Sequence, residues 1–402
     1  MQFSYAYLIT AICFSIQALG VGTYISFGVF FNPLMEEFGW SRAAISGASS
    51  TAFFSMGIFG VIIGRLNDIC GPRRLMSAAA LLLGLGCVLT GRLTTLWELY
   101  LYYGIIFGIG LSAIDVIALT TIARWFSHRR GFMTGIVKVG TGAGQFAIPL
   151  AAGGLILIYG WRWTMAAIGA IVAVILVLMA QFMHRDPDAL GSTSKAAAGS
   201  PPVAAPAAAP VLPLSRVFTM VQFWTICLAN LFLVSCLMVI MLHIVPHARD
   251  IGMPPIQAAG VLSTIGAVSM LGRFASGLVI DKRGSKAVMG VSFLLLLADL
   301  VWLQFADRLW MVYLFGVVYG LAHGGFFTAI SPLVAEWFGI QYHGTLFGIV
   351  VCFGTTGGAV GPLLAGLLFD LSGSYQSTFM ILTALALVAW GLLLSLRPAR
   401  GR

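Results

Sequence analysis

The hydrophobic positions of this chain form long runs that are separated by short polar segments. Twelve runs come near the roughly 20 residues that a helix needs to cross a bilayer, and they cover residues 6–30, 43–64, 75–92, 97–123, 131–157, 161–183, 217–242, 257–280, 287–305, 309–333, 344–368 and 376–396. The runs contain helix formers and many Gly and do not alternate between apolar and polar residues, as the strands of a membrane barrel would. The pattern predicts an all-α membrane protein with twelve transmembrane helices.

Composition agrees with this interpretation. Of the 402 residues, 59% are hydrophobic and only 9% are charged, which excludes a soluble domain. The first run has no basic flank before it and no small-residue cleavage site behind it, so we expect it to remain as a helix. The six Cys show neither metal-ligand nor CxxC spacing, and we expect no metal and no cofactor.

The net charge of +9 is explained by where the basic residues lie. If both termini are cytoplasmic, the cytoplasmic segments hold fifteen Lys and Arg: Arg65, Arg73, Arg74, Arg124, Arg129, Arg130, Arg185, Lys195, Arg216, Lys282, Arg283, Lys286, Arg397, Arg400 and Arg402. The outer loops hold five: Arg42, Arg92, Arg162, Arg249 and Arg308. The positive-inside rule therefore predicts a multi-pass protein of the plasma membrane with both ends cytoplasmic, and no nucleic-acid partner is needed to account for the charge.

The middle of the chain has a different composition. Residues 184–216 are rich in Pro, Ala, Gly and Ser and have no apolar period, which indicates a flexible cytoplasmic linker. The linker divides the chain into an N-terminal six-helix half, 1–183, and a C-terminal six-helix half, 217–402.

A short motif occurs once in each half. Gly64, Asp68, Gly71 and Arg73 are repeated 213 residues later as Gly277, Asp281, Gly284 and Lys286, and the same offset relates Gly, Pro, Ser and Thr positions from the first to the fifth helix of each half. A single offset predicts two parallel, pseudo-symmetric halves with a substrate site between them. Gly permits tight turns and close helix approach, and the acid can accept from donors at a neighbouring helix N-terminus or pair with a nearby Arg. We interpret the repeated loops as elements of conformational gating, or as a latch and topology signal, outside the substrate site.

Four charged residues lie inside the predicted spans: Asp115, Lys138, Arg273 and Asp299. A charged side chain inside a bilayer costs free energy, so we expect each of the four to have a structural or functional role. Counting about 1.5 Å per residue from the cytoplasmic ends places the first three at one depth. Arg273 aligns with Gly60 in the repeat and Lys138 with Val351, so the charges fall where the halves differ.

Several roles are open for these residues. Arg273 suits a carboxylate held through two hydrogen bonds, with structural pairing as the alternative. Lys138 is either a second ligand or the ion-pair partner of Asp115, whose protonation is a candidate coupling step. Asp299 lies on a peripheral helix, where we expect an interfacial role.

Three uncharged side chains are weaker candidates. His323 is either a proton relay or a packed, hydrogen-bonded group. Tyr24 and Tyr319 each offer a hydroxyl to a carboxylate.

The duplicated G-x-x-x-D-x-x-G-x-[RK] loop, the twelve spans and the central linker resemble the major facilitator superfamily. Within it, "SFGVFFNPLMEEFGWSRAAIS", "WFSHRRGFMTG" and the segment from "VPHARDIGMPP" to "GRFASG" are similar to the branch of monocarboxylate transporters and oxalate/formate antiporters. This resemblance implies alternating access, small organic anions, proton coupling in many members, and Arg273 as the anion ligand. The chain departs from the animal monocarboxylate transporters at Ser269, where they carry Asp, and in its uncharged first span.

Together these observations predict a secondary transporter that moves a small organic anion, a monocarboxylate, with a proton. An anion exchanger is the first alternative and a transporter-like metabolite sensor the second. We expect a monomer in the lipid bilayer, and we expect no enzyme, because no nucleophile and base are arranged together.

Overall fold

The computed structural model describes residues 2–126, 129–187 and 213–396, which are helical with short connections and contain no strand. The first span consists of α1 (Gln2–Ser26), the short η1 (Phe27–Phe30) and α2 (Phe31–Phe38). The second and third are α3 (Arg42–Cys70) and α4 (Pro72–Thr90), and the fourth runs through α5 (Leu96–Leu99), the π-helical η2 (Tyr100–Phe107) and α6 (Gly108–Trp125).

The next helix, α7 (Arg130–Ala180), contains two spans. Gly160 inside it has φ 76° and ψ 162°, a conformation that other residues rarely adopt, and it turns the chain back on itself. The described residues contain 11 helices that are long and apolar enough to cross a membrane, and the division of α7 at Gly160 makes twelve spans. The prediction of twelve transmembrane helices is confirmed.

The second half begins with the short α9 (Leu214–Thr219). It continues with α10 (Val221–Asp250), α11 (Pro255–Arg283), α12 (Ser285–Leu303), α13 (Leu309–Phe338), α14 (His343–Ser372) and α15 (Gln376–Ser395). Residues 214–216, which composition assigned to the linker, thus belong to a helix. Most of the predicted linker, 188–212, lies outside the described residues, as do 397–402 with their three Arg.

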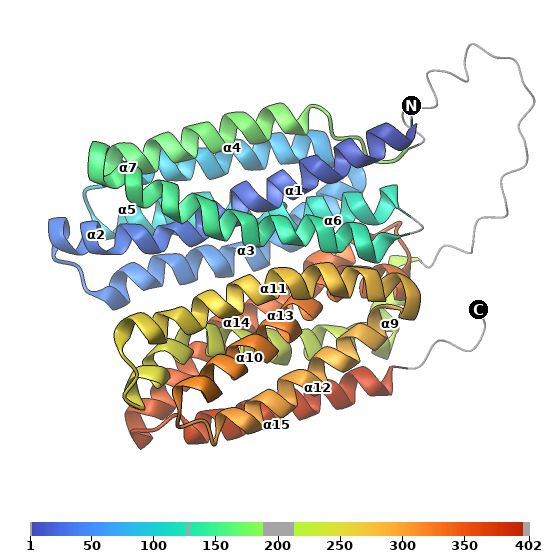
Figure 1. The fold of residues 1–402 in the computed structure, drawn as a ribbon. Helices are drawn as coiled ribbons and strands as arrows, with labels where there is room; N and C mark the ends of the chain where they lie inside the picture. The colour runs from blue at the N-terminus through green and yellow to red at the C-terminus, as the bar shows by residue number, and fades with distance from the viewer. Residues whose placement is uncertain (1, 127–128, 188–212, 397–402) are drawn as a thin grey trace, which may run out of the picture.

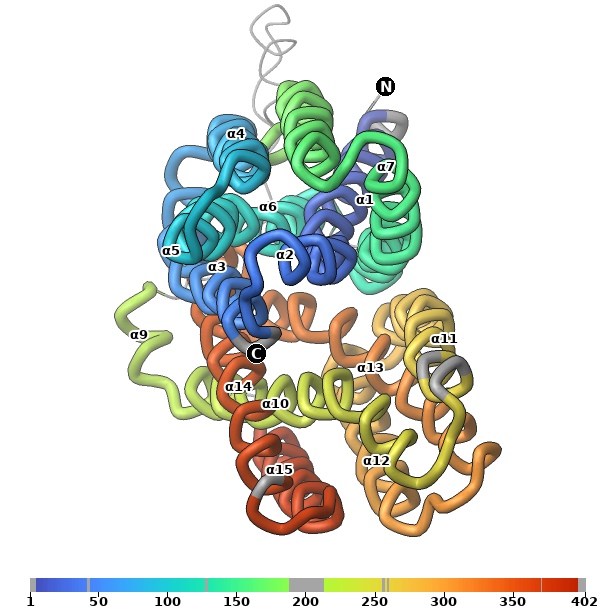
Figure 2. Tube along the Cα trace, turned by 90° about the vertical axis from the view of Figure 1, so that its left-hand side faces the viewer, coloured from blue at the N-terminus to red at the C-terminus, as the bar shows by residue number. Residues whose placement is uncertain are grey.

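The helices form two bundles that lie side by side. One contains α1 to α7 and the other α9 to α15, and Figures 1 and 2 show the boundary between them. Across this boundary α3 packs against α14, and α7 packs against α11. Helix α7 ends and helix α9 begins at one end of the molecule (Figure 1), which we call the linker end. The two bundles are the pseudo-symmetric halves that the internal repeat predicts.

Candidate functional site

A polar network occupies the centre of the N-terminal half. Lys138 on α7 forms an ion pair with Asp115 on α6, with Nζ and Oδ1 2.7 Å apart. Gln17 on α1 donates from Nε2 to the same oxygen at 2.7 Å, and the hydroxyl of Thr141 donates to Gln17 Oε1 at 2.9 Å. The Lys138 side chain is only 4% exposed, whereas 25% of the Asp115 side chain is exposed. The carboxylate is therefore the accessible member of the pair.

Arg273 extends this network across the boundary between the halves. It lies on α11, is buried, and donates from Nη1 to the main-chain carbonyl of Lys138 at 2.8 Å. Its Nε is buried and has no hydrogen-bond partner within the protein. A buried guanidinium with an unused donor is costly unless an acceptor arrives, so this side chain is suited to receive an anion.

An aromatic ring lies beside both cations. The ring centroid of Phe327 on α13 is 5.9 Å from Lys138 Nζ and 6.0 Å from Arg273 Cζ. The ring of His323, one turn earlier, lies 4.8 Å from that of Phe327, and its Nδ1 is 2.8 Å from the hydroxyl of Ser269. The structure thus brings together Asp115, Lys138, Arg273 and His323 from four helices of both halves.

The remaining candidates lie elsewhere. Tyr319 is fully buried and its hydroxyl donates to the carbonyl of Leu237 at 2.8 Å, so its proton is already engaged by the protein. The hydroxyl of Tyr24 accepts from Ser49 at 3.4 Å, which leaves its own proton available. Asp299, for which we expected an interfacial role, is 3% exposed inside the C-terminal half, and its Oδ2 has no hydrogen-bond partner.

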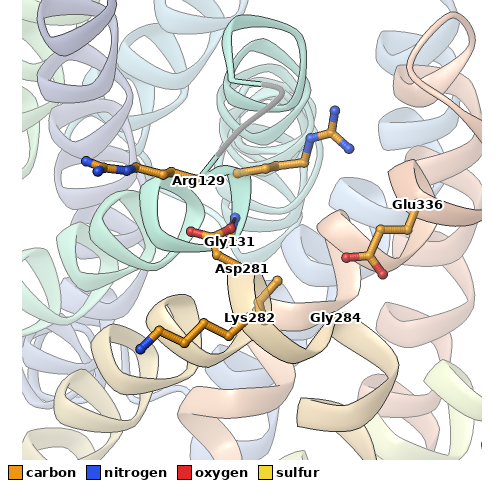
Figure 3. Close-up of a pocket in the computed structure, with 8 residues that line it drawn as sticks. Arg129, Gly131, Asp281, Lys282, Gly284 and Glu336 are labelled. Atoms are coloured by element: carbon orange, nitrogen blue, oxygen red, sulfur yellow. Dashed lines mark hydrogen bonds between the residues drawn. The ribbon is translucent and has the colours of Figure 1, made fainter.

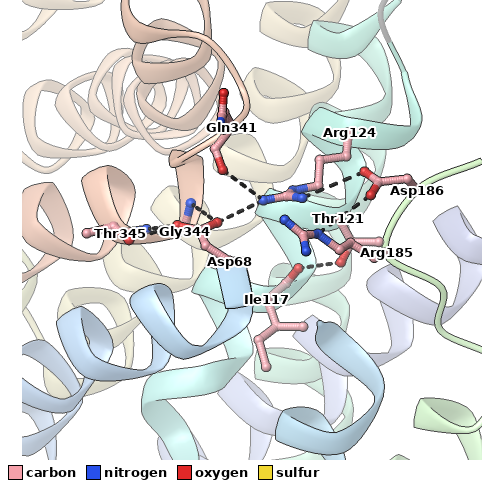
Figure 4. Close-up of polar contacts among 9 residues, drawn as sticks. All are labelled: Asp68, Ile117, Thr121, Arg124, Arg185, Asp186, Gln341, Gly344 and Thr345. Carbon is pink, nitrogen blue, oxygen red and sulfur yellow. Dashed lines mark hydrogen bonds and ion pairs between the residues drawn. The ribbon is translucent and has the colours of Figure 1, made fainter. Parts of the chain in front are cut away.

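At the linker end, the repeated loops connect one half to the other. Asp68 lies in the last turn of α3 and reaches α14 of the opposite half, where it accepts from the main-chain N–H of Gly344 at 3.1 Å and of Thr345 at 2.8 Å (Figure 4). Arg124 of its own half pairs with the same carboxylate at 2.8 Å and donates to the carbonyl of Gln341 at 3.3 Å. The acid therefore binds the positive N-terminus of a helix in the other half.

The second copy makes the same contact in the opposite sense. Asp281 accepts from the main-chain N–H of Gly131 at 2.7 Å and of Phe132 at 3.0 Å, at the N-terminus of α7. Asp281 and Gly131 line a polar pocket together with Arg129, Lys282 and Glu336 (Figure 3). We call the two contacts, Asp68 with α14 and Asp281 with α7, the double clasp. It holds the halves together at the linker end.

The other motif residues explain how each loop is built. Gly71 and Gly284 have φ values of 80° and 78° with ψ values of 168° and 160°, a backbone conformation that is open almost only to Gly, and they end α3 and α11. Arg73 donates from Nε and Nη2 to Gln181 Oε1 at the end of α7, and Lys286 donates to the carbonyl of Leu396 after α15. In each copy the acid contacts the opposite half, while the base contacts the end of the sixth span of its own half.

The first Gly of each copy allows the halves to meet closely. A Cβ atom on Gly64 would overlap the carbonyl oxygen of Gly344, and one on Gly277 would lie 2.8 Å from the carbonyl oxygen of Gly131. The helices pass each other backbone to backbone at these positions, so neither position has room for a side chain.

Comparison with known proteins identifies the family. The family model described as Major Facilitator Superfamily matches residues 10–306 and 274–402. The chain belongs to the major facilitator superfamily. Members of this superfamily are transporters, so the chain is a multi-pass membrane transporter of small molecules and not an enzyme.

The curated relatives include animal proteins of one branch. Monocarboxylate transporter 13 of Rattus norvegicus is 27% identical over 98% of this chain and 89% of its own length. Monocarboxylate transporter 11 of Mus musculus is 26% identical, with 95% and 85% covered. The resemblance to the monocarboxylate transporter branch is confirmed.

Solved structures of the superfamily share the fold. The proton:xylose symporter XylE bound to 6-bromo-6-deoxy-D-glucose superimposes with a TM-score of 0.78 at 14% identity, covering 98% of this chain and 96% of XylE. The human organic anion transporter MFSD10 (TETRAN) gives 0.75 at 17% identity, with 96% and 99% covered. At this identity the likeness shows the architecture alone.

Sequence reasoning missed two members of the network in this transporter. Gln17 and Thr141 are uncharged, so no charge inside a span distinguishes them in the sequence. A usable signal was present, because Gln17 aligns with Asn230 at the offset of 213, and an amide at the same place in both halves is unusual inside a span.

Proposed function

We propose that this transporter carries a small monocarboxylate together with a proton, by alternating access between its two halves. The observation that carries the proposal is the charge of the centre. Arg273 and Lys138 contribute two positive charges and Asp115 one negative charge, which leaves a net charge of +1 at the boundary between the halves. One carboxylate neutralises this charge in a region where an isolated ion is strongly disfavoured.

The binding step uses the donors that face the boundary. The unpartnered Nε of Arg273 and a neighbouring guanidinium nitrogen offer the paired donors that a carboxylate accepts most readily. Lys138 adds a second cation from the other half. The Tyr24 hydroxyl, which lies on α1 outside this network, is a further proposed donor. Tyr319 is not part of this set, because its proton is engaged by Leu237.

The coupling step follows from the ion pair. A substrate carboxylate that approaches Lys138 competes with Asp115 for the same ammonium group. Once Asp115 shares its partner with a second anion, its ionised form loses stabilisation and it takes up a proton. Substrate and proton then enter the site together and leave it together. His323, held by Ser269 beside Phe327, is a second candidate for the proton.

The orientation of the transporter also belongs to this proposal. The positive-inside bias places the linker end in the cytoplasm, in the plasma membrane. Since the double clasp closes the linker end, the structure then corresponds to a conformation that is closed toward the cytoplasm. We propose a monomer, because each copy of the clasp and the central network are complete within one chain.

The test is transport by the purified protein in liposomes. Labelled lactate, pyruvate, formate and oxalate are offered with and without an inward proton gradient, and a protonophore is added in parallel. We expect gradient-driven uptake of the monocarboxylates that the protonophore abolishes. Uptake that requires an anion inside the liposomes and ignores the proton gradient would contradict the coupling and indicate an anion exchanger.

A further inference from the structure

Gln17 and Asn230 are equivalent residues in the two halves, yet their side chains do different things. The offset of 213 relates them, and both are buried on the first long helix of their half, α1 and α10. Asn230 donates from Nδ2 to the main-chain carbonyl of Val350 at 2.8 Å, a contact that joins α10 to α14. Gln17 also reaches a carbonyl, that of Ile114 at 3.3 Å, but its nearer acceptor is the Asp115 carboxylate at 2.7 Å.

The surroundings of the two amides differ in the same way. The repeat aligns Asp115 with Thr328, Lys138 with Val351 and Thr141 with Gly354. The C-terminal half therefore has the amide but not the carboxylate, the ammonium group or the Thr141 hydroxyl: a Thr, a Val and a Gly stand in their places. The comparison separates two contacts of the amide. A hydrogen bond to the main chain of a neighbouring helix is present in both halves, whereas a hydrogen bond to a carboxylate is made by Gln17 alone of the two residues.

Thr141 fixes the orientation of the Gln17 amide. Its hydroxyl donates to Oε1 at 2.9 Å, so Nε2 is turned toward Asp115. Gln17 is fully buried, and the reversed orientation is costly because the amide oxygen would face a carboxylate. A donor held on an ionised carboxylate favours the ionised form.

The charged groups around Asp115 come from two helices. Lys138 on α7 forms an ion pair with it, and Arg273 on α11 donates to the main-chain carbonyl of Lys138. His323 on α13 is the other titratable side chain of the centre. The helices α1 and η2 contain no acidic, basic or His residue, and those of α3, α4 and α14 lie near the ends of these helices. Among these groups, Gln17 is thus the uncharged side chain that donates a hydrogen bond to Asp115, whereas the others act on Asp115 through their charge.

From this arrangement we infer that Gln17 is a positioning residue, which holds Asp115 beside Lys138 and sets the pH at which Asp115 takes up a proton. The inference rests on the proposed function in one respect: the proton on Asp115 is taken to be the one that moves with substrate. The placement of Gln17, Thr141 and Asp115 does not depend on which anion is carried.

The variants separate the two contacts of the amide. Gln17→Leu has a similar size and no donor, while Gln17→Asn keeps the amide but is one methylene too short to reach the carboxylate. Thr141→Val keeps the shape of Thr141 and releases the orientation of the Gln17 amide. The matched control is Asn230→Leu, which removes the equivalent amide of the other half. If Gln17→Leu does not fold, Gln17→Asn and Thr141→Val still test the inference.

Protonation of Asp115 is measured directly by infrared difference spectroscopy of the purified protein during a pH titration. The carbonyl band of the protonated acid is assigned by its loss in Asp115→Asn. We expect the midpoint to rise by about one pH unit in both Gln17 variants, by less in Thr141→Val, and to stay in place in Asn230→Leu, since a donor to a charged group acts on this scale. The midpoint of the pH profile of uptake should move with it.

An unchanged midpoint in the Gln17 variants, an equal shift in Asn230→Leu, or a wild-type band that does not titrate would each overturn the inference. A shifted midpoint in a protein without proton-driven monocarboxylate uptake would support the role of Gln17 and contradict the proposed function. Proton-driven monocarboxylate uptake together with an unchanged midpoint would support the proposed function and contradict the role of Gln17.

Discussion

The guanidinium group of Arg273 donates to the main-chain carbonyl of Lys138 at 2.8 Å, so the two buried cations of the centre are joined across the two halves. Each half supplies one cation. In the proposed function, an anion that is held by both cations bridges the boundary between the halves. Substrate binding and conformational change are then linked at one pair of residues.

The first prediction concerns the geometry of Arg273. In Arg273→Lys the charge remains, but the flat fork that offers two parallel donors is lost. We expect transport to fall by about 10- to 100-fold, in line with one or two charge-assisted hydrogen bonds, while the protein still folds. Uptake into liposomes and substrate binding to the purified protein measure the effect. Arg308→Lys, at an exposed position near the far end, is the control and should be unaffected. Wild-type affinity in Arg273→Lys would remove Arg273 from the site.

The second prediction concerns the close passage of helices at the linker end. Gly64→Ala and Gly277→Ala place a methyl group against the backbone of the opposite half, so the closed arrangement should be lost. We expect at least a tenfold loss of transport and a larger separation of the halves at the linker end, measured between spin labels on the two sides. Gly290→Ala is the matched control, since a Cβ there meets open space. Equal effects in all three variants would contradict a role for close approach.

The third prediction concerns the double clasp. Asp68→Asn and Asp281→Asn keep the shape of the side chains and remove the charges that face two helix N-termini. Each loss should cost about 1 kcal/mol in the closed conformation only, which shifts its population roughly fivefold. Because only the closed conformation is destabilised, we expect faster opening at the linker end, slower return to the closed conformation and slower net transport, with substrate affinity nearly unchanged.

Exchange is followed by labelling of single Cys residues at the linker end, and affinity by equilibrium binding. Asp307→Asn, an exposed acid between α12 and α13, is the control. A collapse of affinity with the exchange rate intact would place Asp68 or Asp281 in the binding site instead.

Much of the fold follows from hydropathy, because a bilayer requires long apolar helices and charges mark their ends. The ends themselves are less predictable: α3 continues to Cys70, beyond the predicted 64, because a helix does not stop where the membrane stops. The positive φ of Gly71 ends it instead. The sequence indicated that Asp68 could accept from a helix N-terminus or pair with an Arg, and the structure contains both contacts.

The partners across the chain could not be predicted in the same way. Thr345, which binds Asp68, lies 277 residues away in the other half, and no local pattern connects them. The engagement of the Tyr319 hydroxyl by Leu237 depends on how α13 packs against α10, which hydropathy does not report. The hydrogen bond between Gln17 and Asp115 could not be predicted either, because an uncharged side chain inside a span is not conspicuous in the sequence.

The last prediction concerns the charge of the substrate. With Asp115 ionised the centre carries a net charge of +1, which one carboxylate neutralises; a dianion would leave an excess negative charge in a region of low dielectric. In Asp115→Asn the centre carries +2, so a dianion becomes the matching ligand and the group that takes up the proton is gone. We expect the wild type to prefer monocarboxylates, and Asp115→Asn to favour dicarboxylates by about tenfold or more and to lose proton coupling.

Competition of labelled lactate uptake by unlabelled lactate and oxalate measures the preference, and a pH-sensitive dye inside the liposomes measures proton entry. Asp299→Asn is the matched control, because it removes a buried acid of the other half that lies outside the network. That variant should keep both the preference and the coupling of the wild type. If Asp115→Asn also keeps them, or if the wild type prefers oxalate at neutral pH, Asp115 serves only to hold Lys138 in place. Loss of proton entry in Asp299→Asn alone would move the coupling site to α12.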